Sequence, residues 1–385
     1  MKFLHTSDLH IGKKLFELSM LEEQKAALDQ IYEIALAEKV DAVVIAGDVY
    51  DRAVPSTEAV GLLDDFLTKL AQVHLPVIMI SGNHDCGERV AFADRILERQ
   101  GIHIAGSYDG DLKDVTLSDE WGTVHFICMP FVKPAVTGAQ TSAEAVEKML
   151  SQTPMLGMGS EMTPHRYVLV THYFVTGEQG EEPQLSDSET GVSVGGLDNV
   201  PASLFENFSY VALGHIHKPQ QMGRGNVYYS GSPVKYSFSE VMQEKGVNLV
   251  ELDGQGKAVV TRRLLQPVHG MRCIRGKLSE LMMAAGKAGI SEQAEREDYL
   301  QVTLTDTEEL IDPMGTLRSV YPNVLQIILA KNTFEEVSEY ESRLSGERKS
   351  TAELFADFYE MLKGEPLDEV RRAYVEDAVK EAEGQ

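Results

Sequence analysis

The chain has few cysteines, no long apolar run and far fewer bases than acids. Its three cysteines, Cys86, Cys128 and Cys273, are widely separated and form no CxxC pair, which argues against a disulfide framework and a structural zinc site. No stretch is apolar for long enough to be a signal sequence or a membrane helix. We therefore expect a cytoplasmic protein with no membrane partner.

The charge balance excludes one way of binding nucleic acid. The 385 residues include 60 acids and 35 bases, a formal net charge of −25. Proteins that bind nucleic acid through a net positive surface charge carry clustered Lys and Arg instead. A polyanionic substrate must therefore be held locally, or with help from a partner.

Short apolar runs alternate with amphipathic segments through residues 1–268, which predicts a layered α/β domain. From 269 to 334 the pattern reads strand, helix, strand, helix, strand and predicts a small α+β domain. Residues 335–385 predict a linker and two helices. Apolar periodicity disappears over 176–200, where Gly, Glu and Ser are frequent, so we expect a long surface loop.

The sequence predicts two helices with an apolar face, and for each face two packing partners remain possible. A capped helix is expected over 55–73, and its broad apolar surface packs on its own sheet or, as the secondary interpretation, on a second copy of the chain. The first C-terminal helix places Leu354, Phe355 and Phe358 on one face. It docks on its own domain or binds another protein.

Polar motifs follow the apolar runs where strands are expected to end. Ligand sites of α/β sheets gather at the carboxyl ends of strands, so motifs far apart in sequence can meet on one rim. Aspartate and asparagine oxygens with histidine nitrogens suit divalent cations such as manganese, iron or zinc. The first hypothesis is therefore a hydrolytic centre with two metal ions. The motifs are Asp8-Leu9-His10, Gly47-Asp48, Gly82-Asn83-His84-Asp85, Thr171-His172 and Gly214-His215-Ile216-His217.

The spacing within these motifs indicates separate roles. Asp8 and His10 are two apart, and on an extended segment they project the same way and can bind one ion together. Asp48 follows a strand and a flexible glycine, where its two oxygens could bridge two cations. Further ligands are expected from Asn83, His172, His215 and His217.

His84 is expected to play a different part. Its neighbour Asn83 should point at the metal, and adjacent side chains of an extended segment diverge. His84 is therefore interpreted as a proton donor or transition-state stabiliser near the leaving oxygen. Asp51 or Asp85 could orient its ring.

The ordered motifs DxH, GDxxD, GNHD, TH and GHxH resemble the calcineurin-like metallophosphoesterase superfamily. The segments 5–13, 194–198, 200–205 and 229–240 resemble, more narrowly, the nuclease subunits of bacterial double-strand-break repair complexes. The resemblance implies a layered β-sandwich core flanked by helices, a small capping domain over 269–334 and a C-terminal helical hairpin that binds an ATPase.

It also implies a manganese-dependent DNA nuclease with two Mn²⁺ ions, for which Mg²⁺, iron or zinc are alternatives. One ion would be held by Asp8, His10, Asp48 and His217, and the other by Asp48, Asn83, His172 and His215. His84 would assist departure of the sugar oxygen.

The implied assembly is a homodimer within a heterotetramer, in which a coiled-coil ATPase uses ATP and this chain binds no nucleotide. The implied activities are an ATP-dependent double-strand exonuclease and a single-strand or hairpin endonuclease. They would serve DNA repair, recombination and replication in the nucleoid-associated cytoplasm.

Basic residues in or beside the motif loops are candidates for phosphate contacts despite the acidic total. The basic candidates are Lys13, Arg52, Arg89, Lys218 and Lys235.

Cys86 follows the GNHD motif at a position where the family favours a small residue such as Ser. It is interpreted as a small side chain that fills space or, secondarily, as an oxidation-sensitive thiol.

Two rival functions remain at this point. The metal motifs are shared by phosphoesterases that act on a small phosphodiester or a phosphoprotein, although the capping domain and acidic helical tail speak against that reading. The second rival is a DNA-end tethering subunit without catalysis, which the full ligand set disfavours.

Overall fold

A computed structural model describes most of the chain. The chain divides into two compact units, Met1–Cys273 with Ser291–Leu300, and Ile274–Ile290 with Gln301–Gln385. No helix in the described part of the chain is long and apolar enough to cross a membrane. The described residues are all except 154–165, 178–179, 190–196, 224, 288–293, 309, 331–350, 364–365 and 383–385.

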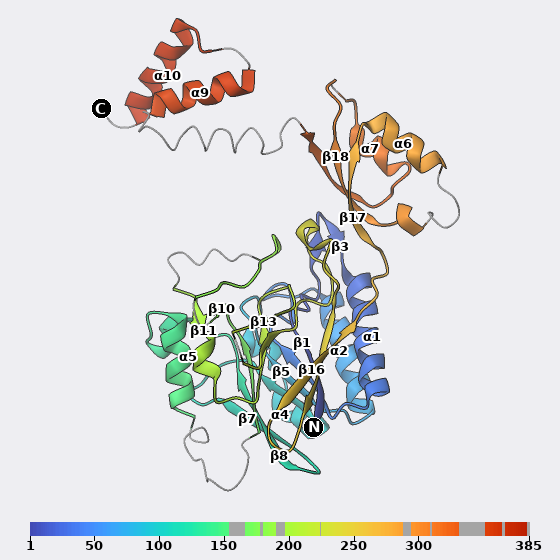
Figure 1. Ribbon diagram of the computed structural model, residues 1–385, viewed down its shortest axis with the longest axis vertical. Coiled ribbons are helices and arrows are strands. Elements are labelled where there is room, and N and C mark those ends of the chain that lie inside the picture. Colours follow the sequence, from blue (N-terminus) through green and yellow to red (C-terminus); the bar gives the residue numbers. More distant parts are fainter. Residues whose placement is uncertain are drawn as a thin grey trace. The chain divides into compact units, whose positions relative to one another are not determined.

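The larger unit is built on two six-stranded sheets (Figure 1). The strand order of the first sheet is β16 (Ala258–Leu264), β15 (Gly246–Leu252), β1 (Lys2–Thr6), β4 (Ala42–Ala46), β5 (Val77–Ile80), β6 (Ile102–Ala105). The strands β1, β4, β5 and β6 are parallel to one another, whereas β15 pairs antiparallel with β1 and β16 pairs antiparallel with β15.

The second sheet has four central parallel strands with one antiparallel strand at each edge. Its strand order is β13 (Gln220–Met222), β14 (Val227–Tyr229), β12 (Tyr210–Gly214), β9 (Tyr167–His172), β8 (Gly122–Met129), β7 (Lys113–Asp119). Both sheets therefore place the carboxyl ends of their parallel strands at one edge.

The core fills the space between the sheets because alternate strand residues point to opposite faces. In β9, Val168 and Val170 pack with Phe3 of the first sheet. Leu169 faces the other way and packs with Val146 of α5 (Ser142–Ser151). The central strands β9 and β12 are fully buried, which explains their nearly continuous apolar runs.

Helices cover the outer faces of the sandwich. Figure 1 shows α1 (Leu21–Glu38) and α2 (Thr57–Gln72) beside the first sheet and α5 beside the second. The α2 helix begins as predicted, because the Ser56 side chain accepts a hydrogen bond from the Ala59 amide (3.2 Å). The predicted α/β fold, a layered β-sandwich flanked by helices, is confirmed. Short strands and α-helices between these elements include β2 (Lys14–Leu15), β3 (Leu18–Ser19), α3 (Gly87–Val90), α4 (Asp94–Leu97), β10 (Val175–Thr176) and β11 (Val200–Pro201).

Residues 271–329 form the predicted alternation of strands and helices, with a three-stranded sheet of order β17 (Met271–Gly276), β18 (Tyr299–Leu304), β19 (Val324–Leu329). The second helix begins at Pro313, because the Asp312 side chain caps it by accepting from the Gly315 amide (3.0 Å) and Pro313 occupies its first position. The helices are α6 (Leu278–Lys287) and α7 (Pro313–Arg318).

Two contacting C-terminal helices are also present, α9 (Thr351–Lys363) and α10 (Glu369–Ala382). Residues 335–350 of the predicted linker lie outside the described part. The domain boundaries at 268 and 334 stay predictions.

Candidate metal centre

The ligand candidates follow the ends of parallel strands in both sheets. In the first sheet, Asp8 and Asp48 come two residues after β1 and β4, and Asn83 comes three residues after β5. In the second sheet, His172 is the last residue of β9 and His215 directly follows β12. The His215 amide donates to the Asp8 carboxylate across 207 positions of the chain (2.9 Å). Distant motifs therefore meet at one edge, as sequence reasoning expected.

The prediction that Asp8 and His10 lie on an extended segment is wrong. The β1 strand ends at Thr6, and both residues have left-handed backbone, with φ of 53° and 43°. Asp48 (φ 48°) and His215 (φ 100°) share this property. Such backbone costs on the order of 1 kcal/mol or more for each residue that is not glycine, and it is concentrated at functional sites. The side chains converge through these tight turns, and strand alternation plays no part.

Three glycines allow the ligand loops to approach one another. A Cβ atom at Gly82 would overlap the Asp48 carboxylate, and one at Gly214 would overlap the Ala46 carbonyl oxygen. Gly47 has φ of +85° and lies against the His172 ring. These positions tolerate no side chain, so the glycines of the motifs are required by the close approach of the loops.

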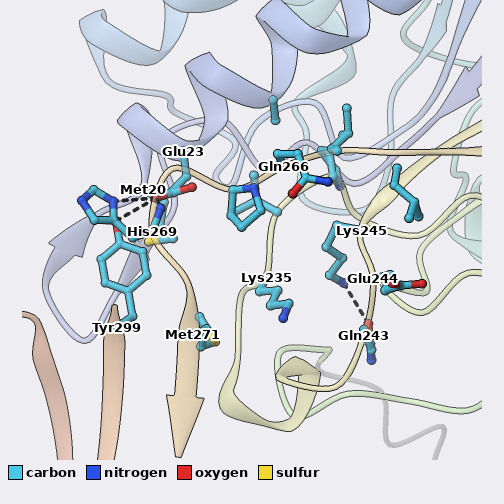
Figure 2. A pocket seen from close by; sticks show the side chains of 16 residues that line it. Met20, Glu23, Lys235, Gln243, Glu244, Lys245, Gln266, His269, Met271 and Tyr299 are labelled. Atoms are coloured by element: carbon cyan, nitrogen blue, oxygen red, sulfur yellow. Dashed lines mark hydrogen bonds and ion pairs between the residues drawn. The ribbon is translucent and has the colours of Figure 1, made fainter. Parts of the chain in front are cut away.

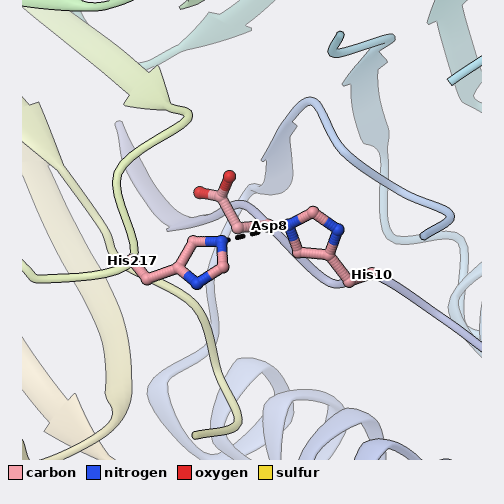
Figure 3. Close-up of side chains that lie close together, drawn as sticks. All are labelled: Asp8, His10 and His217. Atoms are coloured by element: carbon pink, nitrogen blue, oxygen red, sulfur yellow. Dashed lines mark hydrogen bonds between the residues drawn. The ribbon is translucent and has the colours of Figure 1, made fainter. Parts of the chain in front are cut away.

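One group of donors consists of Asp8, His10 and His217, whose ligand atoms lie within 4.8 Å of one another (Figure 3). All three side chains are buried. The Nε2 atoms of His10 and His217 are 3.1 Å apart. Two imidazole nitrogens that face each other beside a carboxylate are suitably placed to share a cation.

A second group surrounds Asp48. Its Oδ2 atom lies 3.2 Å from His172 Nε2 and 3.7 Å from His10 Nε2. The Asn83 Oδ1 atom lies 3.0 Å from His172 Nε2 and 2.9 Å from His215 Nδ1. Asp48 therefore stands between the two groups of imidazoles, where one carboxylate can serve both.

Burial and charge shift the protonation of these groups in opposite directions. Burial lowers the pKa of His10, and burial together with the neighbouring His172 charge lowers that of His215 to about 3. Burial also raises the pKa of Asp8. Burial opposes the charged form of His172, but the charge and hydrogen bond of Asp48, with the Asp8 charge and the Ala46 carbonyl, together raise its pKa to about 9. Burial likewise opposes ionisation of Asp48, but the neighbouring His172 lowers its pKa. A cation would compensate the buried carboxylates and use the imidazole lone pairs directly.

The donor set fits divalent cations. It combines carboxylate and amide oxygens with imidazole nitrogens, the ligands that suit manganese, iron or zinc. At two of the histidines the nitrogen that faces away from the centre is held by an oxygen, His172 Nδ1 by the Ala46 carbonyl (2.8 Å) and His217 Nδ1 by the Ser188 hydroxyl (2.8 Å). Such outer hydrogen bonds commonly orient metal-binding histidines.

His84 is held beside the cluster by Asp51, one of the two residues expected to orient its ring. Its Nδ1–H donates to the main-chain carbonyl of Asp51 (3.0 Å), and its backbone N–H donates to Asp48 Oδ1 (2.9 Å). The Asp51 carboxylate instead pairs with Lys13 (2.8 Å). Asp51 thus supports His84 through its backbone.

Asp85 does not touch the His84 ring in any described hydrogen bond. Its carboxylate accepts from the amides of Val49 (3.0 Å), Tyr50 (2.9 Å) and Gly82 (2.9 Å). Burial and the nearby Asp48 charge raise the pKa of Asp85 to about 6. Its role is to tie together the loops that follow β4 and β5.

The predicted phosphate-binding bases are found in different settings. Arg52 is exposed, with 80% of its side chain accessible. Arg89 donates to the Ala53 carbonyl (2.9 Å) and Lys218 to the Gln184 side chain. Lys235 donates to the Val241 carbonyl (2.6 Å), and burial lowers its pKa. Substrate contact by these bases and by Lys13 stays a prediction.

Cys86 is half-buried and its thiol donates to Glu88 (3.3 Å).

Four residues that surround His217 were not predicted from the sequence. Glu189 accepts from the His217 backbone N–H, Ser188 contacts the ring, and Lys245 donates to the His217 carbonyl (3.0 Å). Glu240 pairs with Lys245 (2.6 Å). Ser188 and Glu189 lie in the segment expected to be a surface loop, where no apolar periodicity marks a buried contact.

Comparison with known families defines the class of protein. Residues 1–219, more than half of the chain, match the family described as calcineurin-like phosphoesterase. Residues 267–362 match the family described as type 5 capsule protein repressor C-terminal domain. Together with the fold and the donor cluster, the first match defines an enzyme, a phosphoesterase that depends on divalent metal ions.

Curated relatives narrow the class. The chain is 30% identical over 380 residues to a protein of Staphylococcus epidermidis named as the D subunit of nuclease SbcCD, with 96% of each chain covered. It is 30% identical over 372 residues to a protein of Staphylococcus saprophyticus with the same name, with 95% of this chain and 94% of that one covered. The chain therefore belongs to the family of SbcCD nuclease D subunits. A solved structure from Thermus thermophilus aligns with a TM-score of 0.41 at 14% identity over 68% of this chain and 98% of that one, a similarity too low to support an argument.

Proposed function

We propose that the chain is a manganese-dependent DNA nuclease that hydrolyses phosphodiester bonds with two metal ions. The full-length similarity to proteins named as the D subunit of nuclease SbcCD supports this substrate. The observation that carries the proposal is the place of Asp48, whose Oδ2 atom lies 3.2 Å from His172 Nε2 and 3.7 Å from His10 Nε2. A carboxylate between two sets of imidazoles is what a bridged pair of cations requires.

The two ions share Asp48 in this proposal. Bound there, they would supply a nucleophile from water at neutral pH and offset negative charge on the phosphate. Oxygen and nitrogen donors without a thiolate suit Mn²⁺, and also Mg²⁺, iron and zinc. Asp8, His10, Asp48 and His217 would hold one ion, and Asp48, Asn83, His172 and His215 the other.

His84 acts on the leaving group. Its Nδ1–H is held by the Asp51 carbonyl (3.0 Å), so Nε2 is the nitrogen left for the substrate. With hydrogens on both nitrogens, the imidazolium passes the Nε2 hydrogen to the departing sugar oxygen and is left as the neutral ring with its hydrogen on Nδ1. The ring stands edge-on to His10, with 4.8 Å between ring centroids. The proton donor is therefore adjacent to the ligands of one ion, where the scissile bond has to lie.

DNA is held by local bases and by a partner, since the net charge of −25 supplies no general attraction. Arg52 and Lys218 lie one residue from Asp51 and His217 and can meet the phosphates that flank the scissile one. Arg89, Lys13 and Lys235 belong to the same proposal; each donates a hydrogen bond inside the protein, as Lys218 does to Gln184.

An SbcC-like coiled-coil ATPase is the proposed partner, and ATP is used by that partner. The C-terminal helices offer exposed aromatic side chains, with 45% of Phe355, 45% of Phe358 and 80% of Tyr374 accessible. Apolar exposure of this kind is typical of a binding surface. The chain forms a homodimer within a heterotetramer, through α1 and α2, and works in the nucleoid-associated cytoplasm in repair, recombination and replication.

The test is a cleavage assay on end-labelled DNA. Purified chain, alone and with its ATPase partner and ATP, is incubated with Mn²⁺ and duplex, hairpin or single-stranded DNA. Wild type should shorten duplex ends only with ATP and partner, and should cut hairpins and single strands, whereas Asp48→Asn and His84→Gln should not. Intact DNA together with metal-dependent cleavage of a small phosphodiester would show that the substrate is wrong.

A further inference from the structure

The segment Ser186–Glu189 contacts His217 at two separate atoms. Glu189 accepts from the His217 backbone N–H, and the Ser188 hydroxyl lies 2.8 Å from His217 Nδ1. Lys245 holds a third atom, the His217 carbonyl oxygen (3.0 Å). This ligand candidate is therefore held through its amide, its carbonyl and its ring.

We propose that Ser188, oriented by Glu240, is a positioning residue that fixes the ring tautomer of His217 so that Nε2 is the metal-binding atom. The inference rests on the proposed metal centre but does not depend on which phosphodiester is hydrolysed. It assigns a role to a serine and a glutamate that lie outside the set of ligands.

The direction of the hydrogen bonds follows from which groups can donate. The Ser188 hydroxyl lies 2.5 Å from Glu240 Oε1, and a carboxylate accepts only, so the hydroxyl hydrogen points at Glu240. The serine oxygen is then left to accept, and its remaining neighbour, His217 Nδ1, must carry the hydrogen. In a neutral imidazole the lone pair is then on Nε2. That atom faces His10 Nε2 at 3.1 Å, inside the donor cluster.

Glu240 is kept ionised and in place by a buried partner. Its side chain is fully buried, and Oε2 lies 2.6 Å from the ammonium of Lys245, which is itself 5% exposed. Lys245 also donates to Ser232 (3.0 Å) and Gln243 (2.9 Å). Figure 2 shows Lys245 with its bond to Gln243 on the wall of a cavity of about 190 Å³. The ammonium cannot swing away without losing several bonds, so Glu240 presents a fixed acceptor to Ser188.

The other histidines of the cluster are held differently. His172 Nδ1 faces the backbone carbonyl of Ala46 (2.8 Å), which no substitution removes. His10 Nδ1 is buried and has no hydrogen-bond partner among the described residues. The His217 arrangement depends on a side chain, so it can be removed cleanly by substitution.

The test compares three variants of the full-length protein. Ser188→Ala removes the acceptor, Ser188→Thr keeps a hydroxyl at the same position, and Ser186→Ala is the matched control. Ser186 lies in the same segment and its hydroxyl accepts from Gln243 (3.1 Å), away from the His217 ring. Thermal melts confirm that each variant is folded.

Two measurements avoid any dependence on activity. Mn²⁺ alone is titrated into each metal-free protein by calorimetry and electron paramagnetic resonance, and the ring nitrogens of His217 are observed by ¹⁵N NMR in the metal-free state. We expect Nδ1 to carry the hydrogen in wild type. Ser188→Ala should show a mixture of tautomers and weaken one of the two Mn²⁺ sites about 10- to 100-fold, with Ser188→Thr and Ser186→Ala near wild type.

The inference is overturned if the wild-type ring carries its hydrogen on Nε2, if Ser188→Ala binds both ions as wild type does, or if Ser186→Ala loses the same affinity. Failure of the proposed function looks different. A wild type that binds two Mn²⁺ ions through the expected tautomer yet leaves DNA intact refutes the nuclease and leaves the role of Ser188 standing.

Discussion

His5 should make the protein less stable in mild acid. Its ring is fully buried between the sheets, where Nε2 faces the Leu213 carbonyl (3.2 Å) and Nδ1 faces the Tyr210 hydroxyl (2.9 Å). Burial lowers the pKa of His5 from 6.5 to about 3. Below pH 6.5 the unfolded chain therefore binds a proton that the folded protein does not bind. Stability is present above that pH and is lost as the pH falls through it.

The size of the effect follows from the distance to the unfolded pKa. A pH of 5 lies about 1.5 units below the pKa of His5 in the unfolded chain. Protonation of the unfolded chain therefore lowers the free energy of unfolding by about 2 kcal/mol relative to pH 7.5. Urea unfolding of wild type and His5→Gln at both pH values, in the presence of a chelator, isolates this residue. Wild type should lose about 2 kcal/mol more than the variant between the two pH values.

An equal loss in wild type and His5→Gln would refute the reasoning. If the variant is too unstable to compare, an NMR titration of the His5 ring in wild type tests the same point. The ring should show no protonation down to pH 5. A midpoint near 6.5 would show that burial does not control this ring.

Three further substitutions follow from the structure. His84→Gln should lower kcat about 10²- to 10⁴-fold with Mn²⁺ affinity unchanged, because in the proposed mechanism the ring transfers a proton and holds no ion. A parallel loss of metal affinity would contradict that role. Asp85→Ala should cost about 3 kcal/mol or more in urea unfolding, because three backbone amides lose a charged acceptor; an unchanged midpoint would mean that the two loops are tied elsewhere. Asp119→Ala should cost about 3–5 kcal/mol at pH 7, because Arg166, 2% exposed, would be left buried without its partner. The bidentate Arg166 contact lowers the pKa of Asp119. In wild type this stability is therefore present above pH 4 and is lost as the pH falls below it. A wild type whose free energy of unfolding does not change below pH 4 would contradict the pairing.

Strand ends were the predictable part of the site. An apolar run followed by a short polar motif indicates both a buried strand and a ligand candidate at its end. This pattern was enough to predict that Asp48, Asn83 and His172 lie at strand ends. The smaller unit was predictable for a similar reason, since the period changes from strand to helix along it. In both cases the signal is local in sequence.

The missed features are those that depend on contacts between distant segments. The left-handed backbone of Asp8 and His10 has no composition signal, because it is imposed by hydrogen bonds to the loop after β4, such as His10 N–H to the Asp48 carbonyl (2.9 Å). The position of β15 beside β1 joins residues about 250 apart. The contact of Ser188 with His217 likewise brings an irregular segment onto a strand-end loop, and no periodicity marks such a segment.

The most direct test of the central claim is the crystal structure of the Mn²⁺-loaded protein with anomalous diffraction at the manganese edge. We predict two anomalous peaks about 3.5–4 Å apart, both in contact with the Asp48 carboxylate, one beside Asp8 and His217 and the other beside Asn83 and His172. A single peak, or two peaks that do not share Asp48, would contradict the account.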